Sequence, residues 1–339
     1  MNLKELTKTA GQMIANHRGL LAADESAGTI EKRFKSVGVV STEDTRRAYR
    51  EMLFTAPGVE KFISGVIMYD ETIRQKTSAG VPFAEYLAKL GIVPGIKVDK
   101  GAKPLAGSPE EKVTEGLDGL RERLQEYHAL GARFAKWRAV IEIGAGTPSE
   151  YCLRANAQAL ARYAALCQEA GLVPVVEPEV LMDGEHTIES CAEVSLTALK
   201  AVFDELDIHR IALEGMILKP NMIVSGMQCA QQAAVGKVAA ETLRVLKQRV
   251  PAAVPGIMFL SGGQSAELAT AHLSAMNALG PAPWKLSFSY ARALQTPALE
   301  AWKGQAANVA ASQKAFIRRA QLNSAACAGA YTPHMEKAA

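Results

Sequence analysis

Eight short apolar runs, each ending in a polar or charged residue, alternate along this chain with longer stretches of helical character. Runs that are apolar on both faces are typical of parallel strands covered by helices. Strands that alternate with helices predict right-handed βαβ units, and eight of them predict a (β/α)8 TIM barrel of the α/β class. The runs cover residues 19–24, 62–69, 93–99, 134–141, 173–179, 214–221, 256–261 and 284–290.

The stretches between the runs carry helix signals. The clearest is 149–170, because residues 147–150 (TPSE) are a start signal and Gly171 is a stop signal. Residues 191–206 and 265–279 show the same pattern. The alternative fold is a doubly wound open sheet, which usually has fewer strands and a glycine-rich first turn. The turn DESAG at 24–28 matches that turn poorly.

No linker-like stretch divides the chain, so we expect residues 1–339 to form a single barrel domain. Extra helices are expected before Gly19 and after about Gln305, followed by a short, frayed C-terminal tail. No apolar run approaches the roughly 18 residues of a membrane span, and the N-terminus has no signal-peptide core. We therefore expect no membrane association.

Charge and motif content exclude several function classes. Lys and Arg number 38 against 35 Asp and Glu, a balance that argues against a nucleic-acid-binding protein. The five cysteines form no CxxC pair, which favours a reducing, cytoplasmic location. The histidines show no HxH or HExxH spacing, and no glycine-rich nucleotide motif occurs. We expect neither a metal nor a cofactor.

Polar residues at the ends of the runs predict one active site, because a parallel barrel gathers the carboxyl ends of its strands at one mouth. A buried charge without a partner costs several kcal/mol, so several charges at one mouth favour a functional role. Each residue taken singly could instead be a solvated rim residue. The run-end residues are Asp24, Glu25, Asp70, Lys97, Asp99, Lys136, Arg138, Glu177, Glu179, Lys219, Ser261, Ser289 and Arg292.

Lys219 follows an apolar run and precedes Pro220. A lysine amine is a nucleophile only when neutral, and desolvation or a nearby cation such as Lys136 favours that form. A neutral lysine forms an imine with a ketone or aldehyde, and the protonated imine stabilises a neighbouring carbanion. The alternative is a lysine that extends to the rim and keeps its charge in water.

Two further motifs predict acid–base chemistry and anion binding. Two carboxylates in one pocket, here Glu177 and Glu179, push their pKa values apart and supply an acid and a base. They could instead form salt bridges with Lys136 and Arg138. The glycine-rich string at 261–265 (SGGQS) opens a helix next to the eighth run, and such loops bind phosphate in barrels.

Eight longer strings resemble those of class I fructose-1,6-bisphosphate aldolase, in order, from about residue 5 to about residue 333. The resemblance implies a (β/α)8 barrel, usually a homotetramer. It also implies reversible cleavage of fructose 1,6-bisphosphate to dihydroxyacetone phosphate and glyceraldehyde 3-phosphate, in glycolysis and gluconeogenesis. The strings cover 21–26 (LAADES), 95–101 (GIKVDKG), 116–120 (GLDGL), 134–138 (FAKWR), 173–179 (VPVVEPE), 213–222 (LEGMILKPNM), 259–265 (FLSGGQS) and 287–295 (SFSYARALQ).

The resemblance also implies roles for single residues. Lys219 corresponds to the imine-forming lysine, Glu177 to the acid/base of imine formation, and Asp24 to the base for the C4 hydroxyl. Lys136 assists carbinolamine chemistry, and Glu179 supports the charge network. The expected C1-phosphate residues are Ser261, Gly262 and Arg292. The expected residues around the C6 phosphate and its approach are Lys97, Ser26 and Arg33, and Arg138 is also expected to bind substrate.

Two departures from the family pattern bear on the expected chemistry. Ala291 stands where the family usually has glycine, and its Cβ would be strained if φ were positive there. Animal members end in a mobile tail with a terminal tyrosine that helps proton exchange. Here the last tyrosine is Tyr331 and the sequence ends in EKAA at 336–339, so either another group does that work or the step is slower.

Two alternative functions compete with the aldolase interpretation. One is a related imine-forming barrel, similar to transaldolase, that acts on monophosphates. Two separate phosphate-facing clusters favour the bisphosphate instead. The other is a catalytically idle barrel that serves as a binding scaffold, and the joint presence of Lys219, Glu177 and Asp24 argues against it.

Overall fold

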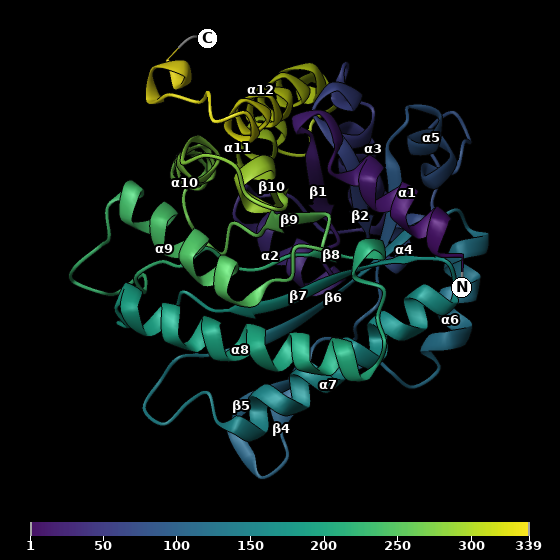
Figure 1. Ribbon diagram of the computed structural model, residues 1–339. Coiled ribbons are helices and arrows are strands. Elements are labelled where there is room, and N and C mark those ends of the chain that lie inside the picture. The colour runs from purple at the N-terminus through teal and green to yellow at the C-terminus, as the bar shows by residue number, and fades with distance from the viewer. Residues whose placement is uncertain (1, 338–339) are drawn as a thin grey trace.

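The computed structural model describes residues 2–337 and contains a closed barrel of eight parallel strands (Figure 1). The barrel closes between its first and last strands, where Leu20 pairs with Ser289. This closure confirms the predicted (β/α)8 barrel and excludes the open sheet. In order around the barrel the strands are β1 (Gly19–Ala23), β2 (Ile63–Met68), β3 (Val93–Lys97), β6 (Phe134–Ile141), β7 (Val173–Val180), β8 (Ile217–Leu218), β9 (Gly256–Phe259) and β10 (Lys285–Tyr290).

Each predicted run contains one strand, and most strands are shorter than their runs. The largest difference is β8, which has two residues because Leu213–Gly215 forms a 3-10 turn before it. Every residue of β1, β2 and β7 is buried. This burial on both faces is the physical reason that the runs lack an alternating pattern.

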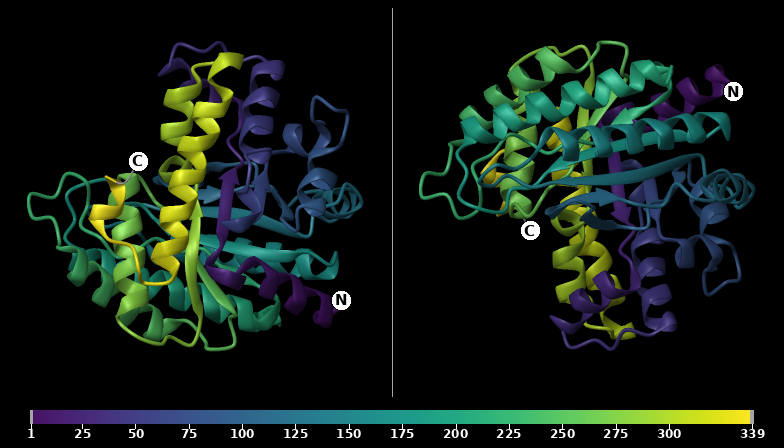
Figure 2. Two further views of the ribbon diagram at one scale, coloured as in Figure 1. Left: turned by 90° about the horizontal axis from the view of Figure 1, so that it is seen from above. Right: turned by 90° about the horizontal axis from the view of Figure 1, so that it is seen from below.

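Helices enclose the barrel on its outside, as Figures 1 and 2 show. The predicted helix at 149–170 is confirmed as α7 (Glu150–Glu169), which Ser149 caps by accepting from the N–H of Cys152 at 3.1 Å. The others are α1 (Leu3–Met13), α2 (Ala27–Lys35), α3 (Glu43–Phe54), α4 (Asp70–Arg74), α5 (Phe83–Lys89), α6 (Leu120–Ala129), α8 (Ile188–Ile208), α9 (Val235–Arg249), α10 (Ala266–Ala278), α11 (Arg292–Trp302) and α12 (Val309–Cys327).

The amino-terminal end of the barrel is filled with apolar side chains. Helix α1 contributes Leu6, Ala10 and Met13 to a buried cluster that also contains Phe134 of β6. Gly95 on β3 makes room for the Phe134 ring, since a Cβ at that position would lie 2.1 Å from it. Apolar filling at this end leaves the carboxyl ends of the strands as the polar end of the barrel.

A two-stranded antiparallel sheet, β4 (Ala102–Leu105) and β5 (Ser108–Thr114), projects between β3 and α6. Its strands contain exposed charges and prolines, so the apolar-run criterion used for the barrel does not detect them. The buried carboxylate of Glu111 fastens this sheet to the start of α7 by accepting from the N–H of Ser149 at 2.7 Å.

The C-terminal segment is docked on the barrel, contrary to the expected frayed tail. After α12 the chain turns back, and Pro333–Glu336 forms a 3-10 turn. Arg319 of α12 pairs with Glu336 at 2.7 Å, and the Tyr331 hydroxyl donates to the same carboxylate at 2.8 Å. Residues 338–339 of the expected tail lie outside the described residues.

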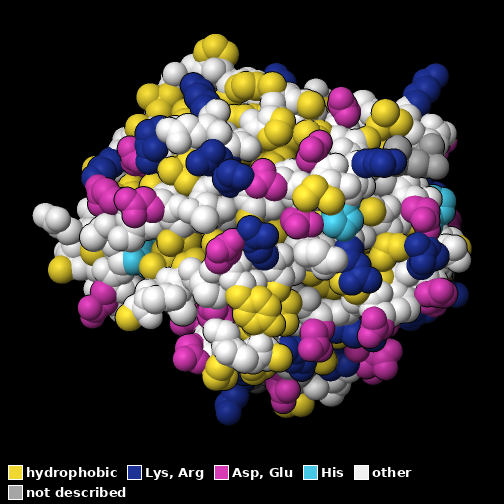
Figure 3. Space-filling model, turned by 60° about the horizontal axis from the view of Figure 1, so that its bottom comes forward, with side chains coloured by type: hydrophobic (Ala, Val, Ile, Leu, Met, Phe, Trp, Pro, Cys, Tyr) yellow, Lys and Arg dark blue, Asp and Glu magenta, His cyan; other side chains and the backbone are white. Residues whose placement is uncertain are grey.

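The surface carries both signs of charge. On the face that Figure 3 shows, Lys and Arg side chains are interspersed with Asp and Glu. This mixture fits the nearly balanced composition of the chain. Within residues 2–337, none of the helices combines the length and the apolar character that crossing a membrane requires.

Candidate active site

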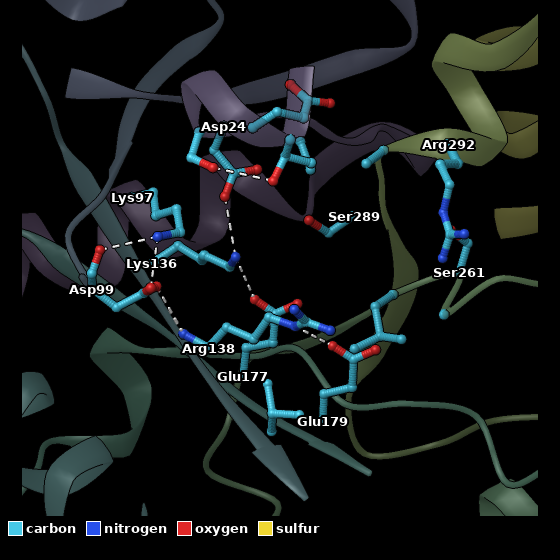
Figure 4. A pocket seen from close by; sticks show the side chains of 18 of the residues that line it. Asp24, Lys97, Asp99, Lys136, Arg138, Glu177, Glu179, Ser261, Ser289 and Arg292 are labelled. Atoms are coloured by element: carbon cyan, nitrogen blue, oxygen red, sulfur yellow. Dashed lines mark hydrogen bonds and ion pairs between the residues drawn. The ribbon is translucent and has the colours of Figure 1, made fainter. Parts of the chain in front are cut away.

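A cavity of about 680 Å³ opens at the carboxyl ends of the barrel strands. The structure brings all twelve predicted site residues to its wall, from seven of the eight strands and the segments that follow them. Asp70, the run-end residue after β2, does not line this cavity. The twelve are Asp24, Ser26, Arg33, Lys97, Lys136, Arg138, Glu177, Glu179, Lys219, Ser261, Gly262 and Arg292. Figure 4 draws 18 of the lining residues and labels ten, with Lys136 and Glu177 between two opposite sides of the pocket.

Strand register explains why these side chains meet. Lys97 of β3 pairs in register with Lys136 of β6, and Arg138 of β6 pairs with Glu177 of β7. Residues two apart on one strand point to the same face, so each charged pair is directed into the pocket. The N–H of Lys219 donates to the carbonyl of Val176 at 2.8 Å, which places Lys219 just beyond β8 and beside β7.

Four buried charges form a continuous chain across the pocket floor. The Nζ atom of Lys219 lies 3.1 Å from Oε1 of Glu177, and the Nζ atom of Lys136 lies 2.9 Å from Oε2 of Glu177. Lys136 also donates to Oδ2 of Asp24 at 3.1 Å. Two cations thus alternate with two carboxylates, which compensates for the cost of burying each charge.

The same contacts set the protonation of the chain. Burial would raise the pKa of Asp24, but the charges of Lys136, Lys219 and Lys97 outweigh it and hold that pKa well below its ordinary value. Burial and the lysines act on Glu177 in the same opposed way, and its pKa is also lowered. Burial lowers the pKa of Lys136, but Asp24 and Glu177 raise it well above the ordinary value. At neutral pH these three side chains are charged.

A second layer of charges surrounds this chain. Asp99 accepts from Lys97 Nζ at 2.6 Å and from the backbone N–H of Arg138 at 3.3 Å. The guanidinium of Arg138 pairs with Glu179. The anticipated bridge between Glu179 and Arg138 is therefore present, and Asp99 is an additional residue that holds Lys97 and β6 together. Its position two residues after Lys97 was the available sequence signal.

Glu25, next to Asp24, is the centre of a buried network to which sequence reasoning assigned no role. Its carboxylate pairs with Arg33 and, at 2.9 Å, with Arg50 of α3. The Gln295 amide of α11 donates to Glu25 at 2.8 Å and to the carbonyl of Ala22 at 2.6 Å. This network holds the end of β1. Neither Arg50 nor Gln295 carries a local signal, since they lie 25 and 270 residues from Glu25.

Hydrogen-bond donors gather on the side of the pocket formed by β9, β10 and the loops after them. Gly262 has φ +62° and lines the pocket with Ser261 and Arg292. The buried hydroxyl of Ser289, which also lines the pocket, finds no hydrogen-bond partner within residues 2–337. An arginine and a glycine-rich loop at the start of a helix favour an anion. Figure 4 shows Ser261 and Arg292 opposite Lys97 and Asp99.

Ala291 fits this side of the pocket without strain from a positive φ. Its φ is −104° and its ψ is −84°, so φ is negative although the pair lies outside the main α and β regions. Its backbone precedes Arg292, the first residue of α11. The Cβ that distinguishes this chain from the usual glycine therefore does not meet the strain of a positive φ.

The pocket combines a buried amine, carboxylates that can exchange protons, and anion-binding groups at two sides. Such a set suits imine chemistry on a carbonyl compound with a negative charge at each end. Among residues 2–337, no three His, Cys, Asp or Glu side chains form a group suited to hold a metal ion.

Comparisons with known proteins match nearly the whole chain. A family model described as "Glycolytic: Fructose-bisphosphate aldolase class-I" matches residues 5–339. A "probable fructose-bisphosphate aldolase class 1" of Xanthomonas campestris pv. campestris is 58% identical over 97% of this chain and 99% of that protein. "Fructose-bisphosphate aldolase 5, cytosolic" of Arabidopsis thaliana is 53% identical over 97% of this chain and 92% of that protein. A solved structure shows the fructose-bisphosphate aldolase of Plasmodium falciparum in complex with TRAP and a small-molecule inhibitor. It matches with a TM-score of 0.96 at 47% identity and covers 97% of this chain and 95% of that chain.

Proposed function

The chain belongs to the class I fructose-bisphosphate aldolase family, and from that membership we propose how the residues of its pocket divide the reaction between them. The reaction is the reversible cleavage of fructose 1,6-bisphosphate to dihydroxyacetone phosphate and glyceraldehyde 3-phosphate through a lysine Schiff base, a step of glycolysis. Membership in this family decides against a transaldolase-like enzyme. The contact between Lys219 and Glu177, 3.1 Å long, is the observation that carries the proposed division of roles.

Lys219 forms the imine. Its amine must lose a proton before it attacks the C2 ketone, and the Glu177 carboxylate is within hydrogen-bond distance to accept it. Attack on C2 gives a carbinolamine. Glu177 then returns a proton to the C2 hydroxyl, water leaves, and a protonated imine remains. The charge of Lys136, 2.9 Å from Glu177, assists by stabilising the carboxylate whenever it is ionised.

Asp24 takes the proton of the C4 hydroxyl when the C3–C4 bond breaks. The electron pair of that bond flows into the protonated imine and gives an enamine, while C4 becomes the aldehyde of glyceraldehyde 3-phosphate. The lowered pKa makes Asp24 a weak proton acceptor at rest. Proton transfer is therefore coupled to bond cleavage, in which the C4 oxygen gains carbonyl character and its proton becomes more acidic.

The second product is released by the reverse of imine formation. A proton from water adds to C3 of the enamine and regenerates the protonated imine, and Asp24 releases to water the proton that it took from the C4 hydroxyl. Glu177 then activates a water molecule that attacks C2, and dihydroxyacetone phosphate leaves as Lys219 becomes free again. The ion pair between Glu179 and Arg138 keeps Arg138 beside Glu177. The Glu177 carboxylate therefore keeps the same neighbouring charge during both halves of the reaction.

Two opposite anion sites orient the substrate. Ser261, Gly262 and Arg292, with the unpartnered hydroxyl of Ser289, bind the C1 phosphate. Lys97, Ser26, Arg33 and Arg138 bind the C6 phosphate or guide its approach. The placement of Lys97 and Arg292 at opposite sides of Lys136 in Figure 4 supports a chain stretched across the floor, with C2 near Lys219.

Three further properties belong to the proposal. The family resemblance supports one domain over residues 1–339 and a homotetramer, which light scattering coupled to gel filtration would measure. The name of the Arabidopsis relative, which calls that protein cytosolic, supports a cytoplasmic location.

Borohydride trapping tests the assignment of the nucleophile. Reduction in the presence of dihydroxyacetone phosphate should inactivate the enzyme and label Lys219, as peptide mapping would show. Lys219→Ala should keep the fold and take up no label. A label on Lys136 or Lys97 would identify a different nucleophile, and no label on any lysine would support an idle scaffold.

A further inference from the structure

Gln264 lies behind the loop that carries Ser261 and Gly262, and it does not line the pocket. Its side-chain Nε2 donates to the carbonyl of Ser261 at 3.1 Å, and its backbone N–H donates to the same carbonyl, also at 3.1 Å. The C=O and N–H of a trans peptide point in opposite directions. Holding the Ser261 carbonyl behind the loop therefore turns the N–H of Gly262 away from Gln264.

The loop N–H groups are left available for a ligand. Within residues 2–337, neither Gly262 nor Gly263 donates its backbone N–H to a protein acceptor. A Cβ on Gly263 would lie 3.3 Å from Nη2 of Arg292, so this part of the loop and the arginine border the same space. Two free N–H groups beside a guanidinium suit an anion.

His272 of α10 sets the direction of the Gln264 amide. Nδ1 of His272 and Oε1 of Gln264 are 2.6 Å apart. The Ser261 carbonyl only accepts, so the Nε2 end of Gln264 faces it, and Nδ1 of His272, which faces the amide oxygen, then carries the proton. His272 is 2% exposed, and burial lowers its pKa to about 4, so the imidazole stays neutral at physiological pH. With Nδ1 protonated, the histidine stabilises this orientation of the Gln264 amide.

Methionine side chains leave the loop little freedom to move. A Cβ at Gly262 would lie 2.8 Å from Cε of Met182, and one at Gly263 would lie 3.5 Å from Sδ of Met227. Gln264 Nε2 also contacts Sδ of Met222 at 3.6 Å. Apolar contacts thus enclose the loop, while the hydrogen bonds from Gln264 orient its Ser261 carbonyl.

We propose that Gln264, oriented by His272, is a positioning residue that presets the Gly262 and Gly263 N–H groups to bind the C1 phosphate of the substrate. This inference rests on the proposed function, because it takes the loop as the C1-phosphate site. Gln264 acts without touching the substrate. Its loss therefore weakens phosphate binding and leaves the chemistry at Lys219 intact.

Gln264→Met tests the proposal, since it keeps side-chain length and removes the side-chain hydrogen bonds to the Ser261 carbonyl and to His272, while the backbone N–H still donates to that carbonyl. KM for fructose 1,6-bisphosphate and the inhibition constant of inorganic phosphate should each rise about tenfold, the change expected for the loss of one hydrogen bond. kcat should stay within about threefold. His272→Leu should have the same effect, and His272→Asn, which can place an N–H near the position of Nδ1, should restore near wild-type KM.

Gln168→Met is the matched control. Gln168 is a buried glutamine that donates to the carbonyl of Ala212 at 2.8 Å, on α7 and outside the pocket lining. This variant should lower Tm and leave KM unchanged. If Gln264→Met and His272→Leu likewise lower only Tm, Gln264 has a structural role alone and the proposal is wrong. Absence of borohydride labelling at Lys219 in the wild-type enzyme would instead refute the proposed function.

Discussion

The Nζ atom of Lys219 lies 3.1 Å from Oε1 of Glu177, at the ends of two neighbouring strands. Glu177 is the only one of these two groups that also contacts Lys136, at 2.9 Å, so it links the proposed nucleophile to a permanent positive charge. This geometry lets one carboxylate take the proton from the amine and give it to the departing hydroxyl. Imine formation should therefore depend on Glu177 as well as on Lys219.

Glu177→Gln should slow imine formation by about a hundredfold, because the amide keeps the size of the side chain and cannot exchange a proton. Rapid mixing with dihydroxyacetone phosphate followed by borohydride quenching measures the rate of covalent labelling. Glu179→Gln is a suitable control, since Glu179 pairs with Arg138 and should affect labelling far less. A wild-type labelling rate in Glu177→Gln would assign the proton transfer to another group.

Asp24→Asn should separate imine formation from cleavage. The variant should still form the imine, which needs Lys219 and Glu177, and should lose at least about a hundredfold in cleavage. Fructose 1,6-bisphosphate should then accumulate as an adduct that borohydride traps. If Asp24 only neutralises Lys136, to which it is bonded at 3.1 Å, imine formation would fall as much as cleavage and no bisphosphate adduct would be trapped.

The two anion sites should be separable by substrate choice. Arg292→Ala removes a charge-assisted hydrogen bond of about 1.5–3 kcal/mol, so binding of fructose 1,6-bisphosphate should weaken by roughly one to two orders of magnitude. Fructose 1-phosphate should be affected similarly, because it retains the C1 phosphate. Arg33→Ala should weaken binding of the bisphosphate and leave binding of fructose 1-phosphate unchanged. Steady-state KM values for the two substrates measure these effects. If Arg292→Ala lowered kcat and left KM unchanged, Arg292 would act in the chemical step and not in phosphate binding.

Ala291→Gly should destabilise the protein by about 0.4–1 kcal/mol without changing KM by more than about twofold. The φ of −104° is negative, so alanine meets no positive-φ strain that glycine would relieve, and glycine adds conformational freedom to the unfolded chain. Urea denaturation and steady-state kinetics provide the two readings. A clear improvement in KM for fructose 1,6-bisphosphate would mean that the methyl group obstructs the C1-phosphate site.

His272 should make the protein less stable in mild acid. Burial lowers its pKa to about 4, against about 6.5 when unfolded, so between these values the unfolded chain binds more protons than the folded one. Stability should therefore fall as pH falls through this window, by about 3 kcal/mol at most. Urea denaturation at pH 7.5 and pH 4.5 should show a smaller loss for His272→Asn than for wild type.

His334→Asn is the control for that measurement, because His334 is exposed and should leave the pH dependence unchanged. Carboxylates such as Glu177, whose lowered pKa also costs stability in acid, contribute equally to all three proteins and cancel in the comparison. Equal acid sensitivity of His272→Asn and wild type would show that His272 is protonated at little cost in the folded state.

The parts of the fold that sequence reasoning predicted are those with a local signal. A strand buried on both faces is apolar throughout, and the residue that ends it is polar because it meets the mouth of the barrel. That pattern sufficed for eight strands and for nine of the twelve residues around the pocket. Start and stop signals predicted α7 with its Ser149 cap, and the glycine-rich string predicted Gly262. Ser26 and Arg33 came only from the family resemblance. The sheet of β4 and β5 has no such pattern, since its strands are short and partly exposed.

Local sequence patterns predict which strand-end side chains reach the carboxyl end of the barrel, because strand period and strand ends are properties of neighbouring residues. Which of these side chains touch one another depends on how the barrel closes. Gln295 bonds to the carbonyl of Ala22 across 273 residues, and Lys136 bonds to Asp24 across 112. Such partners are chosen by barrel closure and strand register, which no local pattern encodes. For the same reason the φ of Ala291 and the docking of Glu336 on Arg319 emerged only from packing.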